Sequence, residues 1–245
     1  MTAPLFLVPA GTLAEGTTSV LLEGPEGRHA ADVQRLTEGE EVLISDGAGR
    51  YAVCQVTQAR RGELELAVHD LRELPQPSPR LVLIQALAKG ERDLMAIEAA
   101  TELDVDEVVP WQADRSIVRW RGDRGTKAHR KWEQTVLTAT KQSRRARVPV
   151  VAEPATRHTV LGRIGGAALA LVLHEEAQES IGAIDLPAAG DVLLVVGPEG
   201  GISPEELAAF TDAGARPVRL GSTVLRTSTA GPAALAVLNA RGRWR

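Results

Sequence analysis

The residues best suited to chemistry lie in two short segments near the end of this 245-residue chain. The first is the loop Gly197–Gly201, in which three glycines accompany Pro198 and Glu199. Glycines let the main chain approach a ligand closely and turn its amides toward it. The loop therefore predicts a ligand site, although a tight glycine turn without a ligand has the same sequence features.

The second segment, residues 218–232, holds Arg226 between Leu225 and Thr227. Neither segment contains the glycine patterns of a P-loop or of a dinucleotide-binding fold, and the chain has no G-x-S-x-G nucleophile motif. The two loops are suited instead to a neutral or cationic cofactor that is held through main-chain groups.

Strands and helices must hold the first loop in place. Val192–Val196 is a run of five apolar residues, which is typical of a strand buried in a parallel sheet. After the loop, Ser203, Pro204 and Glu206 predict a helix that begins with a capping box. The sequence thus predicts a strand, a binding loop and a helix in that order.

The same order recurs around the second segment, where a small apolar run, 233–240, predicts the closing helix. A further strand, 168–173, ends at His174. Ligands gather where parallel strands end, so these turns are expected to meet at one site.

The two segments resemble the paired signature of a known family. The matching patterns, G-P-E-G-G-[apolar]-S and L-G-x-x-x-L-R-x-x-T-A, begin here at Gly197 and Leu220. They are similar to those of the SPOUT methyltransferases, specifically the bacterial 16S rRNA (uracil-N3)-methyltransferase family. The resemblance implies a C-terminal α/β trefoil-knot domain with a mostly parallel sheet, S-adenosyl-L-methionine as cofactor, and a homodimer. It also implies the substrate, a uridine of 16S rRNA near the decoding centre of the 30S particle.

The family resemblance implies which residues hold the cofactor. They are Leu173, His174, Gly197, Gly200, Gly201, Ile202, Leu220, Gly221, Leu225, Thr227 and Ala230.

Arg226 and Glu199 are the candidate catalytic residues. Loss of the N3 proton of uracil spreads negative charge to the flanking carbonyl oxygens, which a fixed cation such as Arg226 would stabilise in the transition state. A structural salt bridge is the alternative for Arg226. Glu199 orients the loop or touches the substrate. Because Ser228 stands where the family usually has Glu, either water or Glu199 accepts the proton.

The first 72 residues predict a small β-barrel of short strands, with the hairpin signal Asp46–Gly49 between two of them. This part resembles the family's PUA-like domain. Two matching residues, His29 and Arg35, are candidates for RNA contact, or alternatively for capping and barrel packing. The Pro-rich stretch 73–79 predicts a linker, and 80–245 alternates strands with helices as in an α/β methyltransferase domain.

Charge is unevenly distributed in this chain of net charge −4. Between Arg115 and Arg147 there are eleven Lys or Arg against two acidic residues, a footprint suited to a phosphate-rich partner. A solvated helix face is the alternative. The candidate RNA-binding residues here are Arg115, Arg119, Lys141, Arg144 and Arg145. Lys141 and Arg144 replace the Glu and Gly that are usual in the family, and this added charge favours phosphate contact over local pairing.

Several classes of protein are not expected. The five histidines lack the spacing of metal ligands, and the single Cys54 lies in an apolar stretch that favours a buried thiol. No apolar run is long enough to span a membrane, so a cytoplasmic protein is expected. Two rivals to the methyltransferase stay open: a non-catalytic RNA-binding or ribosome-assembly factor, and an enzyme whose glycine loop binds the phosphate of a small nucleotide.

Overall fold

A computed structural model describes residues 3–244. The chain forms two compact units: the first runs to Gln76 and includes Thr140–Val148, and the second comprises Pro77–Ala139 and the chain from Pro149 onward. The sequence prediction assigned 140–148 to the second domain, whereas in the structure these residues pack with the first unit. The boundaries 1–72, 73–79 and 80–245 otherwise stay a prediction of domain organisation.

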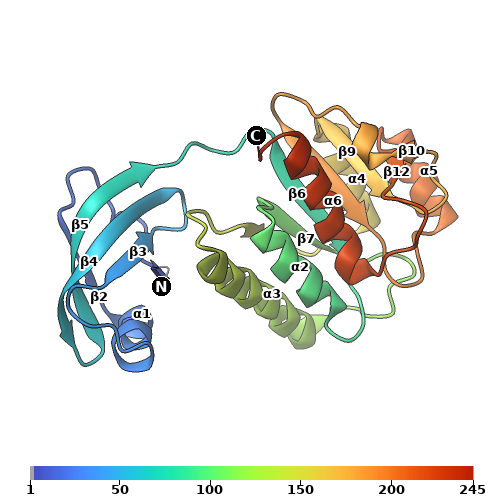
Figure 1. Ribbon diagram of the computed structural model, residues 1–245. Helices are drawn as coiled ribbons and strands as arrows, with labels where there is room; N and C mark the ends of the chain where they lie inside the picture. The colour runs from blue at the N-terminus through green and yellow to red at the C-terminus, as the bar shows by residue number, and fades with distance from the viewer. Residues whose placement is uncertain (1–2, 245) are drawn as a thin grey trace. The chain divides into compact units, whose positions relative to one another are not determined.

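The first unit is built on a curled five-stranded sheet (Figure 1) with strand order β1-β3-β4-β5-β2. β1 pairs with β3 in parallel and the other pairs are antiparallel. The side chains inside it include Phe6, Leu22, Ile44 and Leu64, which makes the predicted barrel-like core. The strands are β1 Leu5–Leu7, β2 Ser19–Leu22, β3 Glu41–Ser45, β4 Arg50–Arg60 and β5 Glu63–Glu73.

A short helical insert lies between β2 and β3 in the chain and adds Ala30 to the core of this unit. It consists of α1 (Gly24–Arg28) followed by one π-helical turn, His29–Val33. Arg35 closes the insert in the left-handed region, at φ 58°.

The Asp46–Gly49 hairpin explains why residues 140–148 join the first unit. The Val148 amide donates to the Gly47 carbonyl (2.9 Å), and the Ser45 hydroxyl donates to the Ala146 carbonyl (2.8 Å). A Cβ atom at Gly49 would lie 2.2 Å from the Arg147 guanidinium. The glycines of this hairpin therefore open the space into which the later segment packs, a contact that no local sequence pattern predicts.

The second unit contains a seven-stranded sheet in the order β10-β12-β9-β11-β6-β7-β8. Every strand pair in it is parallel, which confirms the predicted parallel sheet. The strands are β6 Arg80–Ala86, β7 Glu107–Trp111, β8 Val150–Val151, β9 Leu169–Leu173, β10 Glu179–Ser180, β11 Asp191–Val196 and β12 Arg216–Arg219.

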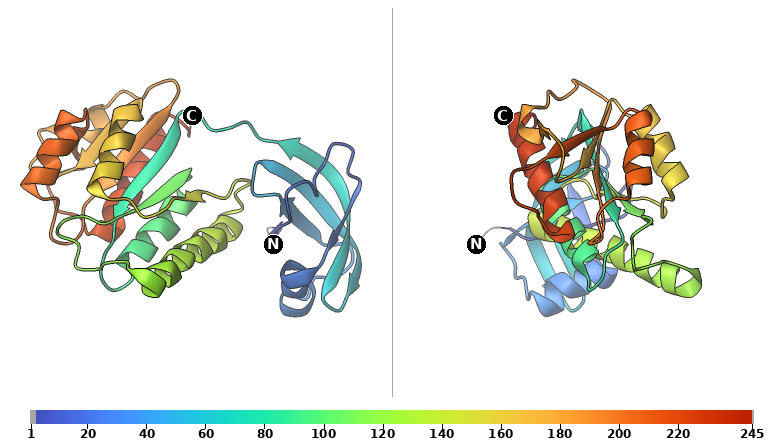
Figure 2. Two further views of the ribbon diagram at one scale, coloured as in Figure 1. Left: turned by 180° about the vertical axis from the view of Figure 1, so that it is seen from behind. Right: turned by 90° about the vertical axis from the view of Figure 1, so that its right-hand side faces the viewer.

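Helices cover both faces of this sheet (Figure 2). α2 and α6 pack together on one face, and α4 and α5 on the other. The helices are α2 Arg92–Glu102, α3 Gly122–Ser143, α4 Arg157–Gly166, α5 Pro204–Asp212 and α6 Thr227–Arg241, and a 3-10 turn spans Ile181–Ala183. α6 begins six residues before the predicted apolar run, so Thr227 and Ala230 belong to a helix and not to a loop.

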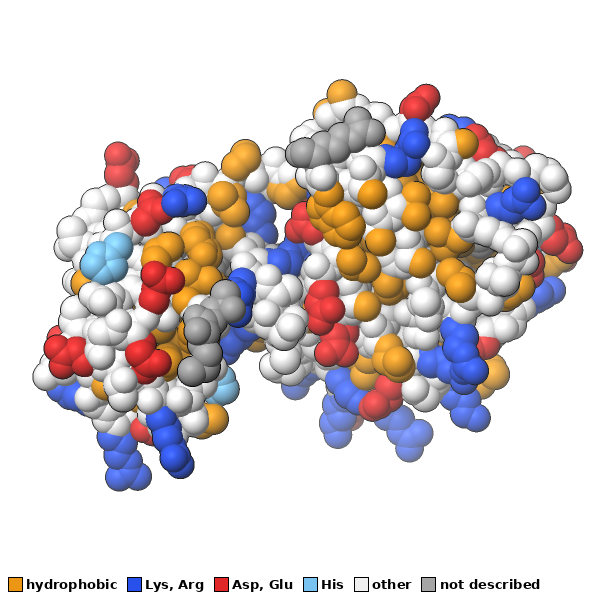
Figure 3. Space-filling view, viewed as in Figure 1, with side chains coloured by type: hydrophobic (Ala, Val, Ile, Leu, Met, Phe, Trp, Pro, Cys, Tyr) orange, Lys and Arg blue, Asp and Glu red, His pale blue; other side chains and the backbone are white. Residues whose placement is uncertain are grey.

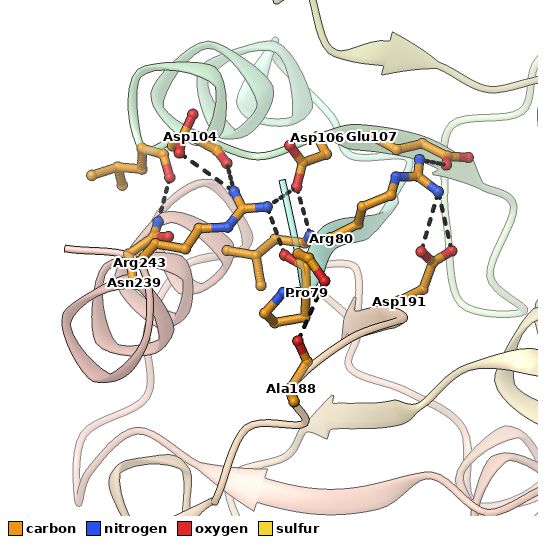
Figure 4. Close-up of polar contacts among 12 residues, drawn as sticks. Pro79, Arg80, Asp104, Asp106, Glu107, Ala188, Asp191, Asn239 and Arg243 are labelled. Atoms are coloured by element: carbon orange, nitrogen blue, oxygen red, sulfur yellow. Dashed lines mark hydrogen bonds and ion pairs between the residues drawn. The ribbon is translucent and has the colours of Figure 1, made fainter. Parts of the chain in front are cut away.

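The chain returns from β12, which is second from the edge of the sheet, to the middle of the sheet, where α6 packs on β6 and β11. Such a return is what the knotted C-terminal segment implied by the family requires. The far end of α6 is fixed by Arg243, whose guanidinium reaches the carbonyls of Pro79 (2.8 Å) and Asp104 (2.7 Å) and the carboxylate of Asp106 (Figure 4).

Candidate active site

A cavity of about 770 Å³ opens at the carboxyl ends of β9, β11 and β12. The loops that follow these strands line it, together with the start of α6. Every residue predicted to hold the cofactor lies in its wall, as do Arg226 and Glu199. The structure therefore brings together one complete set of predicted residues from three separate turns.

The glycine loop is shaped by its own close packing. A Cβ atom at Gly197 would lie 2.7 Å from Cγ1 of Ile202, and Gly201 has a φ of +73°, which favours glycine. The predicted capping box follows at once: the Glu206 amide donates to the Ser203 hydroxyl, and the Ser203 amide donates to the Glu206 carboxylate, each at 3.1 Å. A firmly capped α5 thus anchors one end of the loop.

Glu199 links this loop to the turn before α2. Its Oε1 accepts the Lys89 amide (3.0 Å) and Nη1 of Arg92 (3.2 Å). Its carboxylate is therefore engaged in holding the two turns together. Arg92 itself also lines the cavity.

Arg226 is exposed and occupies the N-cap position of α6. Among residues 3–244 its guanidinium has no acidic partner within ion-pair distance. Within the described residues, Arg226 therefore does not form the structural salt bridge that was the alternative to a catalytic role. The Arg226 carbonyl accepts the amides of Thr229 (2.8 Å) and Ala230 (2.9 Å), which fixes the backbone that carries this free cation.

The candidate RNA-binding residues of the second unit differ in their surroundings. Arg115 lines the cavity and donates to the Gly200 carbonyl (3.1 Å), so it supports the glycine loop directly. Arg119 is exposed. Lys and Arg side chains project along the lower edge of the second unit in the view of Figure 3.

In the first unit, Lys141 departs from the expectation of a free phosphate contact. Its ammonium lies 2.7 Å from one carboxylate oxygen of Glu26 and 5.7 Å from the centre of the Phe6 ring. The local pairing that the sequence argument disfavoured is thus present, because the fold places an acid of α1 opposite this lysine. His29 also makes local contacts, with the Gln34 amide nitrogen (3.0 Å) and the edge of Phe6.

Two other basic residues of the first unit lie at its surface. Arg35 and Arg144 are exposed, and both adopt left-handed backbone conformations, at φ 58° and 56°. Arg145 is half-buried. The positive φ explains why a glycine suits position 144 in the family, and shows that arginine is held there in spite of conformational strain.

Sequence reasoning missed several residues of the cavity wall. Arg92 and Arg219 add positive charge, and Glu175 and Glu176 add negative charge. Nothing in the local sequence pattern of Lys89–Arg92 shows that Glu199 reaches this segment from 110 residues away.

Metal sites, membrane spans and the single cysteine were each considered in the sequence prediction. Within residues 3–244 no group of three or more His, Cys, Asp or Glu side chains is arranged to hold a metal ion. Over the same residues, no helix has the length and apolar character needed to cross a bilayer. Cys54 is buried as predicted, and burial raises the pKa of its thiol to about 11.

The fold and the cavity define an RNA methyltransferase. A family model described as an RNA methyltransferase domain matches residues 75–239, and one described as an RNA methyltransferase PUA domain matches residues 22–68. The chain therefore belongs to this family of RNA methyltransferases.

Individual proteins and solved structures are also similar to this chain. The ribosomal RNA small subunit methyltransferase E of Mycobacterium bovis is 46% identical, over 100% of this chain and 94% of the relative. The protein of the same name from Bacillus subtilis is 28% identical, over 89% and 88%. Among solved structures, a ribosomal RNA small subunit methyltransferase E from Neisseria gonorrhoeae bound to S-adenosyl methionine is 27% identical, with a TM-score of 0.83 over 98% of each chain.

Proposed function

We propose that this chain uses S-adenosyl-L-methionine to methylate N3 of a uridine in 16S rRNA, near the decoding centre of the 30S particle. The observation that carries the proposal is the cavity in which Arg226 stands free beside the glycine loop. The names of the 46% and 28% identical relatives support ribosomal RNA of the small subunit as the substrate. The choice of N3 and of a uridine rests on the family signature at Gly197–Ser203 and Leu220–Ala230.

The residues of the cavity fit the proposed cofactor. A volume of about 770 Å³ lies within the usual range for cofactor sites. The glycine loop offers main-chain groups, and Glu175 and Glu176 offer negative charge to a cationic ligand. When bound, S-adenosylmethionine supplies an activated methyl group with an excellent leaving group. The protein is left to position the acceptor and to manage one proton.

Arg226 would act on the acceptor. As the N3 proton leaves, negative charge spreads to the neighbouring carbonyl oxygens of uracil, and a guanidinium facing them stabilises that charge more in the transition state than in the ground state. Glu199 is bonded to Lys89 and Arg92, so we assign it the role of orienting the loop, and water the role of accepting the proton.

The target base must be unpaired or turned out of its helix, since N3 lies on the Watson–Crick edge. We propose that basic residues, among them the exposed Arg35, Arg119 and Arg144 and the half-buried Arg145, contact the surrounding phosphates. A homodimer that works in the cytoplasm, where ribosomes are assembled, completes the proposal.

Replacing Arg144 with Gly separates charge from conformation. Glycine adopts a φ of 56° without strain, so the free energy of unfolding should rise by roughly 1 kcal/mol. RNA affinity should nevertheless fall, and the salt dependence of binding should flatten by about one unit, because one phosphate contact is lost. Binding titrations at several salt concentrations measure this. An unchanged slope would assign Arg144 to the solvated surface.

Replacing Gly200 with Val tests the loop. A Cβ atom there would lie 3.2 Å from Cβ of Arg115, so a branched side chain must push Arg115 away from the Gly200 carbonyl. We expect the affinity for S-adenosylhomocysteine to be lost in calorimetry while the fold persists. The matched control is Gly165→Val, because Gly165 lies outside the cavity wall, has no positive φ and would bring its Cβ atom within 4 Å of no other atom. Unchanged affinity in Gly200→Val would remove the loop from the site.

The cofactor proposal has a direct test in thermal unfolding. S-adenosylmethionine or S-adenosylhomocysteine at 100 times its Kd should stabilise the protein by about 2.7 kcal/mol, and ATP or NAD should not. Stabilisation by ATP alone would instead favour a small-nucleotide enzyme.

A further inference from the structure

A buried chain of hydrogen bonds connects the glycine loop with the start of α6. The Thr227 hydroxyl donates to the Gly197 carbonyl (2.8 Å), and Nε2 of Gln85 lies 2.8 Å from the same hydroxyl. Gln85 is fully buried in β6, and Thr227 is only 6% exposed. Three segments that are distant in sequence therefore meet through two hydrogen bonds beneath the cavity.

Hydrogen-bond chemistry fixes the orientation of the Gln85 amide. The Gly197 carbonyl can only accept, so the single proton of the Thr227 hydroxyl must point toward it. The hydroxyl oxygen is then left to accept, and only the amide nitrogen of Gln85 can donate to it. The second hydrogen of that nitrogen faces the Ala86 carbonyl (3.3 Å).

This orientation leaves Oε1 of Gln85 buried without a hydrogen-bond partner among the described residues. A buried unpaired oxygen is unfavourable, because it has lost its hydrogen bonds to water and gained none in the fold. An apolar side chain at this place in the strand would avoid that cost. The Gln85 amide therefore lowers the stability of the fold relative to an apolar side chain. What it provides in return is the hydrogen bond that it donates to Thr227.

Close packing of α6 brings the partners together. A Cβ atom at Gly231 would lie 3.1 Å from Cδ1 of Leu83 and 3.5 Å from Oε1 of Gln85. Glycine at this position lets the first turn of α6 approach β6. Arg226, which precedes that turn as its N-cap, is carried with it.

We propose that Gln85 is a positioning residue that acts through Thr227 to fix Arg226 relative to the cofactor loop. In this role Gln85 contacts neither the substrate nor the cofactor. Thr227, expected from sequence to contact the cofactor, uses its hydroxyl internally instead. The inference rests on the proposed methyl transfer, in which Arg226 faces the reacting base.

Four variants test the inference. Gln85→Leu keeps the shape and removes both amide groups, and Thr227→Val removes only the hydroxyl. Thr227→Ser retains the hydroxyl as a rescue variant. Thr101→Val is the control, because Thr101 is also buried and its hydroxyl donates within α2 to the Ile97 carbonyl (2.7 Å).

We expect Gln85→Leu and Thr227→Val to lower kcat roughly 10- to 100-fold, because small displacements of a catalytic group have effects of this size. The melting temperature of Gln85→Leu should equal or exceed that of the parent, since the unpaired oxygen is gone. The double variant should lose no more activity than either single variant, as expected for one connected unit. Thr101→Val should stay near the parent rate, and Thr227→Ser should recover most of the activity that Thr227→Val loses.

Hydrogen exchange gives a readout that does not need the RNA substrate. Peptides covering 197–203 and 226–231 should exchange faster in Gln85→Leu and Thr227→Val, and at the parent rate in Thr227→Ser. Parent exchange in all variants, parent kcat in Gln85→Leu, or multiplied losses in the double variant would each overturn the inference. A parent chain that binds cofactor but methylates no rRNA would count against the proposed function instead, and the exchange result would still decide the role of Gln85.

Discussion

Arg226→Lys should lower kcat for methyl transfer roughly 10²- to 10³-fold, by analogy with the loss of one oxyanion-hole donor. Lysine keeps the positive charge but loses the planar fork that can donate to two neighbouring oxygens at once. The affinity for S-adenosylhomocysteine and the melting temperature should hardly change, because Arg226 is exposed and forms no ion pair with another residue in 3–244. Single-turnover kinetics with 30S particles would measure the effect.

The control for this variant is Arg216→Lys, which changes an exposed arginine of β12 that pairs with Glu179 outside the cavity wall. It should leave kcat unaltered. If Arg226→Lys binds cofactor and methylates at the normal rate, Arg226 has no part in catalysis. If its activity falls only in proportion to a loss of folded protein, the residue has a structural role.

Arg243→Met should destabilise the second unit by about 3–5 kcal/mol, because it removes one partner from a nearly buried ion pair. The Arg243 side chain is 11% exposed and that of Asp106 is 8% exposed. In the variant, the Asp106 carboxylate keeps the Leu81 amide (2.7 Å) and loses its cation (Figure 4). The carbonyls of Pro79 and Asp104 lose their donor as well.

Thermal unfolding would report this loss as a fall in melting temperature of roughly 10 °C or more. Arg216→Met serves as the control, since its ion pair with Glu179 is about half exposed and such pairs contribute at most about 1 kcal/mol. Equal stabilities of the two variants would mean that the network at the end of α6 does not anchor the C-terminal segment.

The parts of the fold that follow local rules were predictable from sequence. The five-residue apolar run before Gly197 is a buried parallel strand, and Ser203 with Glu206 forms the expected capping box. The barrel-like sheet of the first unit was also predictable, although β4 and β5 are longer than the short strands expected, at 11 residues each. The signature around Arg226 located the cavity wall, because those residues are close in sequence to the strands that carry them.

What escaped prediction depends on contacts between distant segments. Lys141 meets Glu26 from 115 residues away, and Glu199 meets Lys89 from 110 residues away. No periodicity shows such pairs. Gln85 did carry a signal, since it is the one polar residue in the run Leu81–Leu87. Its meaning depends on Thr227, which lies 142 residues later and reaches it only after α6 folds back over β6.

The most direct test of the proposed function is a nucleoside analysis of 16S rRNA. The purified chain would be incubated with S-adenosylmethionine carrying a labelled methyl group and with 30S particles from cells that lack the enzyme, and in parallel with naked rRNA. We predict that label appears as 3-methyluridine at a single position near the decoding centre, and that Arg226→Lys abolishes most of it at a fixed short time. Label on another atom or another nucleoside, or no transfer to either substrate by a chain that binds the cofactor, would contradict the proposal.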